Sequence, residues 1–180
     1  MVGSVVVAAL LGFATWTFVE YLVHGILSHR FRTFVTPLHA GHHREPRNVF
    51  TSVLAWGPLA LLFLAVASWV AGVLLGAVYA AALLAGFLHY EWFHWRIHFR
   101  RPRTARQRRL RAHHLAHHLR RSRAYHGVTT RFWDRVFGTL DPHWRDDYAR
   151  VADHPPLQGE SNLRAAWDPR AGWALLRSVR

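Results

Sequence analysis

SVLAWGPLALLFLAVASWVAGVLLGAVYAAALLAGFLHY (residues 52–90) decides the fold class, because it is apolar from end to end. No Asp, Glu, Lys or Arg occurs between Arg47 and Glu91. The stretch has 39 residues, close to twice the length of about 20 residues that one helix needs to cross a bilayer core. Gly72 lies near its middle, where a hairpin turn would fall. We therefore expect two antiparallel membrane helices over 52–71 and 72–90.

A third apolar segment opens the chain at Val2 and runs to Val23. As a helix it is long enough to span the membrane. A cleaved signal peptide is the alternative, but the segment has neither a basic start nor a small-residue cleavage pattern. The sequence thus predicts an all-α integral membrane bundle of about three transmembrane helices, joined to a cytosolic helical cap.

The net charge of +13 comes from 23 arginines and no lysine, against 10 acidic residues. Such a balance in a soluble protein would suggest nucleic acid, but three membrane passages leave every arginine on one side, so no nucleic-acid partner is expected. The positive-inside rule makes that side the cytoplasm, together with all fifteen histidines and the C-terminus. The densest run, RRPRTARQRRLR (100–111), is interpreted either as a surface facing lipid headgroups or as a docking patch for an acidic redox partner.

Cysteine is absent, which excludes disulfides, iron–sulfur clusters and thiolate zinc sites. Histidine instead gathers in four motifs: HGILSH (24–29), HAGHH (39–43), HWRIH (94–98) and HHLAHH (113–118). Residues three and four apart share a helix face, so HxxHH and HxxxH are each expected to aim their rings at one point. His24 and His29 would lie about 140° apart on an α-helix, so they serve different metals or the helix ends between them.

Metal coordination explains why imidazoles gather beside so much positive charge, because ligand rings stay neutral. The histidines of the four motifs exceed what one ion can hold, so two metals are expected. Imidazole suits iron, zinc, copper and nickel alike. In a membrane protein without a hydrolytic motif, we favour redox-active iron. The isolated His126, His143 and His154 are interpreted as ordinary residues.

The motif order HxxxxH, HxxHH, HxxxH, HxxHH, followed by GVTTRFWDRVFGT (127–139), resembles the membrane fatty acid hydroxylase and sterol desaturase superfamily, most closely its fatty acid 2-hydroxylase branch. The resemblance covers roughly residues 20–140 and defines a hydroxylase-like membrane domain over 1–140, with a peripheral C-terminal tail over 141–180. It implies ten metal ligands: His24, His29, His39, His42, His43, His94, His98, His114, His117 and His118. His113 offers a rival register for His114, because it too shares a helix face with His117.

The resemblance also assigns a catalytic or substrate-facing role to Tyr90 and Glu91, which match a Tyr-Asp pair before the third motif; the alternative is that they only cap the membrane helix. The aromatic residues near the motifs either line an acyl slot or belong to the core and the interfacial belt: Trp92, Phe93, Trp95, Phe132, Trp133 and Phe137. In the tail, Trp167, Trp173 and Leu176 are expected to touch the membrane interface.

The activity implied is that of a membrane-bound diiron oxygenase, which hydroxylates a lipid acyl chain with dioxygen. Its cofactors would be two iron ions, with zinc as a substitute in preparations. Nothing in the sequence resembles the haem-binding segment of the cytochrome b5 domain fused to well-known eukaryotic members, so electrons are expected from a separate ferredoxin- or cytochrome-like donor. The oligomeric state is left open.

Three other interpretations stand beside this one. A carotenoid hydroxylase or a sterol or lipid desaturase of the same superfamily would use the same histidine framework. A membrane haem protein would need axial histidines inside the membrane passages, and the first two passages contain none internally. A metal transporter or store would need ionisable residues along the passages, where Glu20 is the only acidic residue.

Overall fold

The computed structural model describes residues 1–31 and 33–171, and over these residues the protein consists of helices and connecting loops without a strand. Three helical stretches are long and apolar enough to cross a membrane: Val2–Leu27, Val53–Ala71 and Val73–Phe99. The predicted all-α bundle with three membrane helices is confirmed, and the protein is an integral membrane protein.

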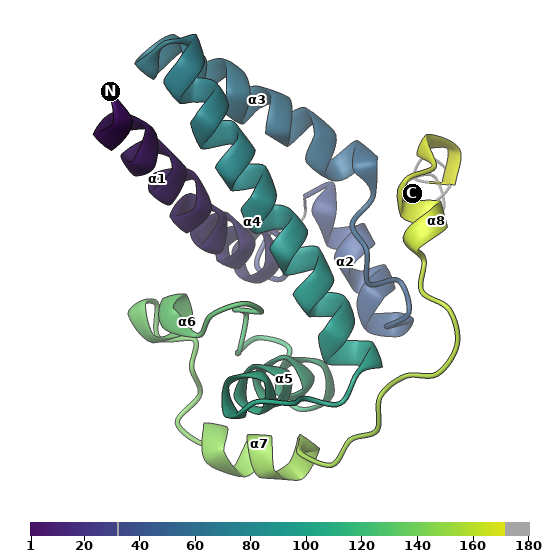
Figure 1. The fold of residues 1–180 in the computed structure, drawn as a ribbon. Coiled ribbons are helices and arrows are strands. Elements are labelled where there is room, and N and C mark those ends of the chain that lie inside the picture. Colours follow the sequence, from purple (N-terminus) through teal and green to yellow (C-terminus); the bar gives the residue numbers. More distant parts are fainter. Residues whose placement is uncertain (32, 172–180) are drawn as a thin grey trace.

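The membrane part is formed by α1 (Val2–Tyr21), α3 (Val53–Ala71) and α4 (Val73–Phe99), with α4 packed against both of the others (Figure 1). Gly72 alone separates α3 from α4 and has φ +80°, so the expected hairpin tip is correct. A left-handed backbone of this kind is easy only for glycine. Where α1 meets α4, a buried apolar cluster holds the two helices together: Trp16, Val19, Leu83 and Phe87.

Helix α4 continues nine residues beyond the expected end at Tyr90, because EWFHWRIHF (91–99) still buries one side against the rest of the protein. Its 27 residues make a helix of about 40 Å, longer than a hydrocarbon core of about 30 Å. The last turns, which carry His94 and His98, therefore project beyond the bilayer core.

A π-helical segment, η1 (Leu22–Leu27), follows α1 directly. Its wider turns are closed by bonds five residues apart, such as Ser28 N to Val23 O at 3.0 Å. The helix ends before His29, and the ring centroids of His24 and His29 lie 5.9 Å apart. Segments of this kind are frequent at functional sites.

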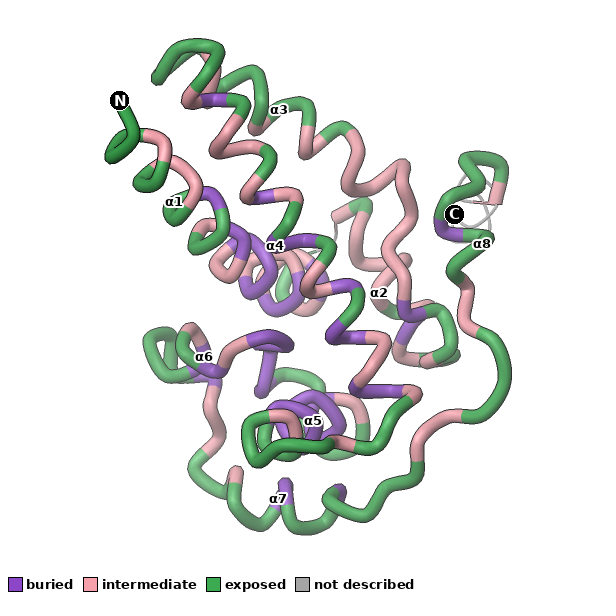
Figure 2. Tube along the Cα trace, viewed as in Figure 1, coloured by how far each residue is buried: buried purple, intermediate pink, exposed green. Residues whose placement is uncertain are grey.

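The cap lies at one end of the bundle and contains α2 (Val35–Arg44), α5 (Ala105–Leu119), α6 (Phe132–Val136) and α7 (Trp144–Val151), with α8 (Leu163–Ala166) beside α3 (Figure 1). Helix α5 begins with a capping box, in which Thr104 and Gln107 each bond the other's backbone N–H. Buried residues gather where α5 meets the lower ends of α1 and α4 (Figure 2). We therefore expect a functional site at the junction of α5 with α1 and α4.

Residues 141–180 were expected to be a peripheral tail, and those up to 171 are described. Within them α7 packs on α5 and adds Tyr148 and Val151 to a buried cluster with Ala112, Leu115 and Ala116. Further on, the Asn162 side chain accepts a hydrogen bond from Phe50 N and donates one to Phe50 O. The ring of Trp167 lies edge-on to Trp56 of α3, at 5.5 Å. Trp173 and Leu176 lie outside the described residues.

Candidate metal centre

Ten histidines converge at the junction of bundle and cap in two groups of five, and within each group one nitrogen from each ring lies within 4.8 Å of the others. The first cluster comprises His24, His29, His39, His43 and His117. The second cluster comprises His42, His94, His98, His114 and His118. These are the same ten residues that the sequence predicts as ligands; their binding of metal stays a prediction.

The two HxxHH motifs are each divided between the clusters, which corrects the expectation that one motif aims at one point. His39 and His43 of α2 face the first cluster, whereas His42 faces the second. In α5 the reverse holds, since His114 and His118 face the second cluster and His117 faces the first. Positions i and i+4 share a direction, and the residue between them at i+3 reaches the neighbouring cluster. The clusters are thereby interlocked, and the rings of His43 and His118 stack at 4.3 Å.

Two alternatives from the sequence are resolved by this geometry. His24 and His29 fall in the same cluster, and the helix ends between them at Leu27, so they do not serve different clusters. His114 points its Nε2 at His94 and His98, at 2.9 and 3.0 Å. His113 belongs to neither cluster.

Nitrogen spacing in the first cluster matches a metal site. The Nε2 atoms of four rings follow one another in a closed circuit, with 2.8 Å from His29 to His39, 2.9 Å from His39 to His43, 3.0 Å from His43 to His117 and 3.1 Å from His117 to His29. A square with sides of about 3.0 Å has a half-diagonal of about 2.1 Å, which is the length of a metal–imidazole bond. The fifth ring, His24, has a buried Nε2 without a hydrogen-bond partner among the described residues.

The second cluster has the same character. His114 Nε2 lies 2.9–3.0 Å from the Nε2 atoms of His94, His98 and His118. Both ring nitrogens of His42 are buried and have no partner in the described part of the chain. Burial lowers the pKa of His42 to about 3 and that of His43 to about 4, and the neighbouring histidines add to the effect. The rings are therefore neutral at physiological pH, as metal ligands must be.

Backbone carbonyls orient two rings of the first cluster. The Nδ1 of His117 donates to Ala124 O at 2.8 Å, and the Nδ1 of His24 donates to His126 O. A donor hydrogen on Nδ1 leaves the Nε2 lone pair free for a metal. Between the two carbonyls lies Tyr125, whose φ of +62° is left-handed and costs about 1–2 kcal/mol. His126, interpreted from the sequence as an ordinary residue, is buried beside His29 and His117.

Two buried carboxylates hold the loop that carries these carbonyls. Asp134 accepts hydrogen bonds from His126 N at 2.7 Å, Gly127 N at 2.8 Å and Thr139 Oγ1 at 2.8 Å. Glu20 accepts from Val128 N at 2.6 Å and from Thr129 N and Oγ1 at 2.9 and 2.6 Å. The GVTTRFWDRVFGT segment thus has a physical role, which is to fix residues 124–129 over the first cluster.

His113 supports the same loop from the other side. Its Nε2 donates to Asp134 Oδ2 at 3.0 Å, and its Nδ1 bonds the Tyr148 hydroxyl. Burial raises the pKa of Asp134, but the hydrogen bonds from His113, Thr139 and Gly127 outweigh it and hold that pKa below its ordinary value. Sequence reasoning missed Asp134 and His113 as positioning residues. A signal for Glu20 was present, because an acidic residue in a membrane helix needs partners.

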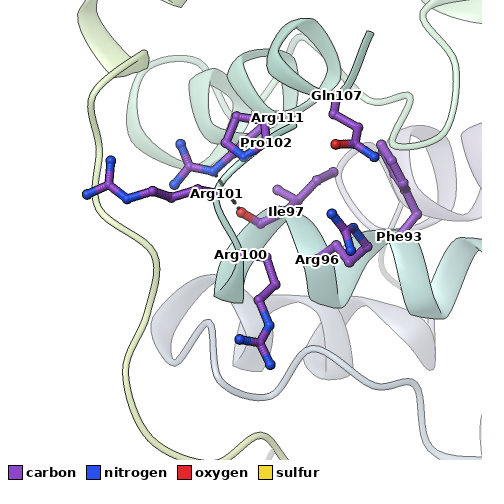
Figure 3. Close-up of a pocket in the computed structure, with 8 residues that line it drawn as sticks. All are labelled: Phe93, Arg96, Ile97, Arg100, Arg101, Pro102, Gln107 and Arg111. Atoms are coloured by element: carbon purple, nitrogen blue, oxygen red, sulfur yellow. Dashed lines mark hydrogen bonds between the residues drawn. The ribbon is translucent and has the colours of Figure 1, made fainter. Parts of the chain in front are cut away.

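The second cluster is positioned by helix packing and one arginine. The Arg111 side chain is buried; its Nε donates to Ile97 O of α4 at 3.0 Å and its Nη2 to His154 O at 2.7 Å. Figure 3 shows Arg111 bonded to Ile97 beside a small pocket at the turn from α4 to α5. The backbone of His98 also accepts a bond from Leu157 N at 2.8 Å. The helices that carry His94, His98 and His114 are tied together at this point.

The predicted pair Tyr90 and Glu91 lies between the second cluster and the membrane. The ring of Tyr90 stacks on His94 at 5.4 Å and contacts Trp16 at 5.8 Å. The buried Glu91 accepts bonds from Thr51 Oγ1 at 2.6 Å and Thr51 N at 3.1 Å, just before α3 begins. Tyr90 therefore touches a predicted ligand, whereas Glu91 secures the start of a membrane helix. Their assignment to catalysis stays a prediction.

Comparison with known proteins agrees with this geometry. A model of the fatty acid hydroxylase family matches residues 9–139. The ceramide very long chain fatty acid hydroxylase of Schizosaccharomyces pombe is 31% identical over 148 residues, which cover 74% of this chain and 42% of that protein. The dihydroceramide fatty acyl 2-hydroxylase of Arabidopsis thaliana is 32% identical over 140 residues, which cover 72% of this chain and 58% of that protein. The chain thus spans about half the length of these relatives.

A solved structure shares the fold. Full-length scs7p, in which only the hydroxylase domain is visible, superposes with a TM-score of 0.68 at 26% sequence identity. The match covers 86% of this chain and 60% of the other.

Proposed function

The chain belongs to the fatty acid hydroxylase family, and on this premise we propose that it is a membrane-bound diiron oxygenase that hydroxylates an acyl chain of a membrane lipid. The relatives it matches are named as fatty acid and ceramide fatty acyl hydroxylases. Two iron ions, dioxygen and a lipid substrate follow from that assignment. Zinc is expected to replace iron in some preparations, because imidazole binds both.

The closed circuit of Nε2 atoms in the first cluster carries the proposal, because its spacing equals that of neighbouring ligands around one ion. The first cluster would hold one iron and the second cluster the other. When bound, the irons supply the redox chemistry, in which dioxygen and two electrons with two protons give one hydroxyl on carbon and one water. The protein's own residues bind, orient and exclude water.

Water is excluded because the clusters are buried. Six of the ten rings are buried and the other four are partly buried, so few waters can approach the reacting atoms. Tyr90 lies where an acyl chain from the bilayer would meet the second cluster, between His94 and the Trp16 cluster of the membrane helices. We assign Tyr90 a substrate-facing role and Glu91 the support of that wall through Thr51.

Electrons are proposed to come from a separate ferredoxin- or cytochrome-like protein. The cap is proposed to lie on the cytoplasmic side, because the arginines gather there and basic loops stay in the cytoplasm. A carotenoid hydroxylase or desaturase remains the nearest alternative, and the named relatives favour the acyl hydroxylase over both. A haem site is disfavoured, since five converging imidazoles exceed the axial positions of a haem iron.

Lipid mass spectrometry of a host that expresses the protein with iron tests the proposal. The wild type is expected to add a hydroxyl to acyl chains of membrane lipids, and His117→Ala is expected to abolish the new species. His143→Ala is the matched control, because this exposed histidine lies outside both clusters. Lipid profiles that do not differ between wild type and His117→Ala would contradict the assignment, whereas new double bonds without hydroxyls would favour the desaturase.

A further inference from the structure

Helix α6 has its apolar side turned outward. Phe132, Val136 and Phe137 are 54%, 53% and 51% exposed, whereas Asp134 within the same segment is completely buried. The flanking Arg131 and Thr139 are buried as well. A helix in water shows the opposite arrangement, with its apolar side chains inside. Large apolar side chains that face outward over a polar interior are typical of a surface in contact with lipid.

Helix α7 of the same cap shows the ordinary arrangement. It buries Tyr148 and Val151 against α5, and its exposed positions are polar or small, such as Arg145, Asp146 and Ala149. The two helices are separated by only seven residues of chain. The difference between them therefore reflects what each one faces, rather than the composition of the cap.

Contacts place α6 at the height of the membrane. The Nε1 of Trp133 donates to Thr17 Oγ1 at 3.1 Å, and its ring lies 5.0 Å from that of Phe18. The ring of Phe137 stacks on Tyr21 at 5.2 Å. All three partners belong to the apolar stretch Val2–Leu27 that crosses the membrane. Figure 1 shows α6 beside the lower end of α1. The outward face of α6 thus continues the lipid-facing surface of α1.

We propose that α6 is an in-plane membrane anchor, whose face of Phe132, Val136 and Phe137 lies among lipid acyl chains at the boundary with the headgroups. The partner is the bilayer surface of the leaflet that adjoins the cap. Trp133 and Arg135 suit this depth, since indole and guanidinium groups both reach toward the headgroup layer. Because Asp134 of α6 also bonds the loop over the first cluster, the anchor fixes the height of that cluster relative to the lipid.

The absence of cysteine from the chain makes a direct test simple. Single spin labels are attached to the full chain in phospholipid nanodiscs through Phe132→Cys, Val136→Cys and Phe137→Cys. A label at Leu10→Cys, on the exposed face of α1, gives the value inside the membrane, and a label at Ala149→Cys on α7 gives the value in water. Collision rates with oxygen, which concentrates in lipid, and with a water-soluble nickel chelate are measured for each.

The oxygen-to-nickel ratio at the three α6 positions is expected to lie several-fold above that of Ala149→Cys and at or below that of Leu10→Cys. Ratios equal to that of Ala149→Cys would overturn the proposal, since α6 would face water. Low collision rates with both reagents would also overturn it, because a second copy of the chain would then cover the face. The measurement needs neither metal nor turnover, so its outcome is independent of the hydroxylase assignment.

Discussion

The two histidine clusters have equal numbers of rings but different supports. Three rings of the first cluster are partly exposed, and two are oriented by carbonyls of a loop that Glu20 and Asp134 hold. Four rings of the second cluster are buried, and all five stand on helices. The Nδ1 atoms of His94 and His114 have no hydrogen-bond partner among the described residues. The first cluster thus depends on a hydrogen-bonded loop, and the second on helix packing.

One ligand type is thus positioned by two kinds of force in this protein. Hydrogen bonds from a loop fix ring rotation directly, whereas packing fixes only where each helix lies. Changes to the loop should therefore affect the first cluster alone, and changes to the contact between α4 and α5 should affect the second.

The largest effect is expected from removal of one ligand in each cluster. His117→Ala and His114→Ala should each lower the metal content from about two ions per chain to about one and reduce hydroxylated lipid to background. Metal analysis of the purified proteins, with His143→Ala as control, measures this. A variant that lost both ions together would show that the clusters do not fill independently.

Asp134→Asn tests the loop. The amide would turn an N–H toward His126 N, Gly127 N, Thr139 or His113, which all donate to the carboxylate. We expect metal affinity of the first cluster to fall about 10- to 100-fold, with the second unchanged. Competition with a chelator measures both affinities, and Asp141→Asn, on a partly exposed carboxylate, is the matched control. An equal loss at both clusters would show that the loop does not act on the first cluster alone.

The sequence was sufficient for the three membrane helices and for the ten residues that converge. Apolar length predicted α1, α3 and α4, and the resemblance of the histidine motifs to the hydroxylase superfamily implied the ten rings. The division of each HxxHH motif was not predictable, because spacing on one helix does not say which neighbour a side chain faces. The role of Asp134 was equally hidden, since a carboxylate that bonds backbone N–H groups leaves no pattern of spacing. The π turn at η1 has no simple sequence signal, although it carries His24 and ends just before His29, two rings of the first cluster.

Arg111→Met tests the support of the second cluster. The change removes one bond to the carbonyl of the buried Ile97 and one to the carbonyl of the exposed His154. An unsatisfied buried carbonyl at Ile97 costs about 1–3 kcal/mol. Thermal unfolding in detergent should shift down, and the second cluster should lose metal before the first. Arg108→Met, at an exposed position of the same helix, should change stability by less than about 0.5 kcal/mol. A loss confined to the first cluster would contradict the assigned role.

Alanine substitutions at two glycines, Gly25 and Gly41, test the packing around the first cluster with a smaller expected effect. A Cβ at Gly25 would lie 2.7–2.9 Å from three side-chain atoms of His126, whereas a Cβ at Gly41 would meet no described atom within 4 Å. Gly25→Ala should cost about 1–3 kcal/mol through overpacking and weaken the first cluster. Gly41→Ala should be neutral or stabilise α2 by up to about 1 kcal/mol. Unfolding curves of the two variants compare them, and equal effects would show that the His126 loop yields freely.

As the pH falls, the two clusters should lose their metal ions one after the other. This is the smallest of the expected effects. Protons compete with metal for Nε2, and a ring with the higher pKa is protonated first as the pH falls. Burial depresses the pKa of His43, in the first cluster, to about 4 and that of His42, in the second, to about 3. The first cluster, which has three partly exposed rings against one in the second, should therefore release its metal at the higher pH. His114→Ala keeps only the first cluster intact and His117→Ala only the second, so the metal that each variant retains after equilibration at successive pH values reports on one cluster. Release from the second cluster at the higher pH would show that exposure does not weaken the first.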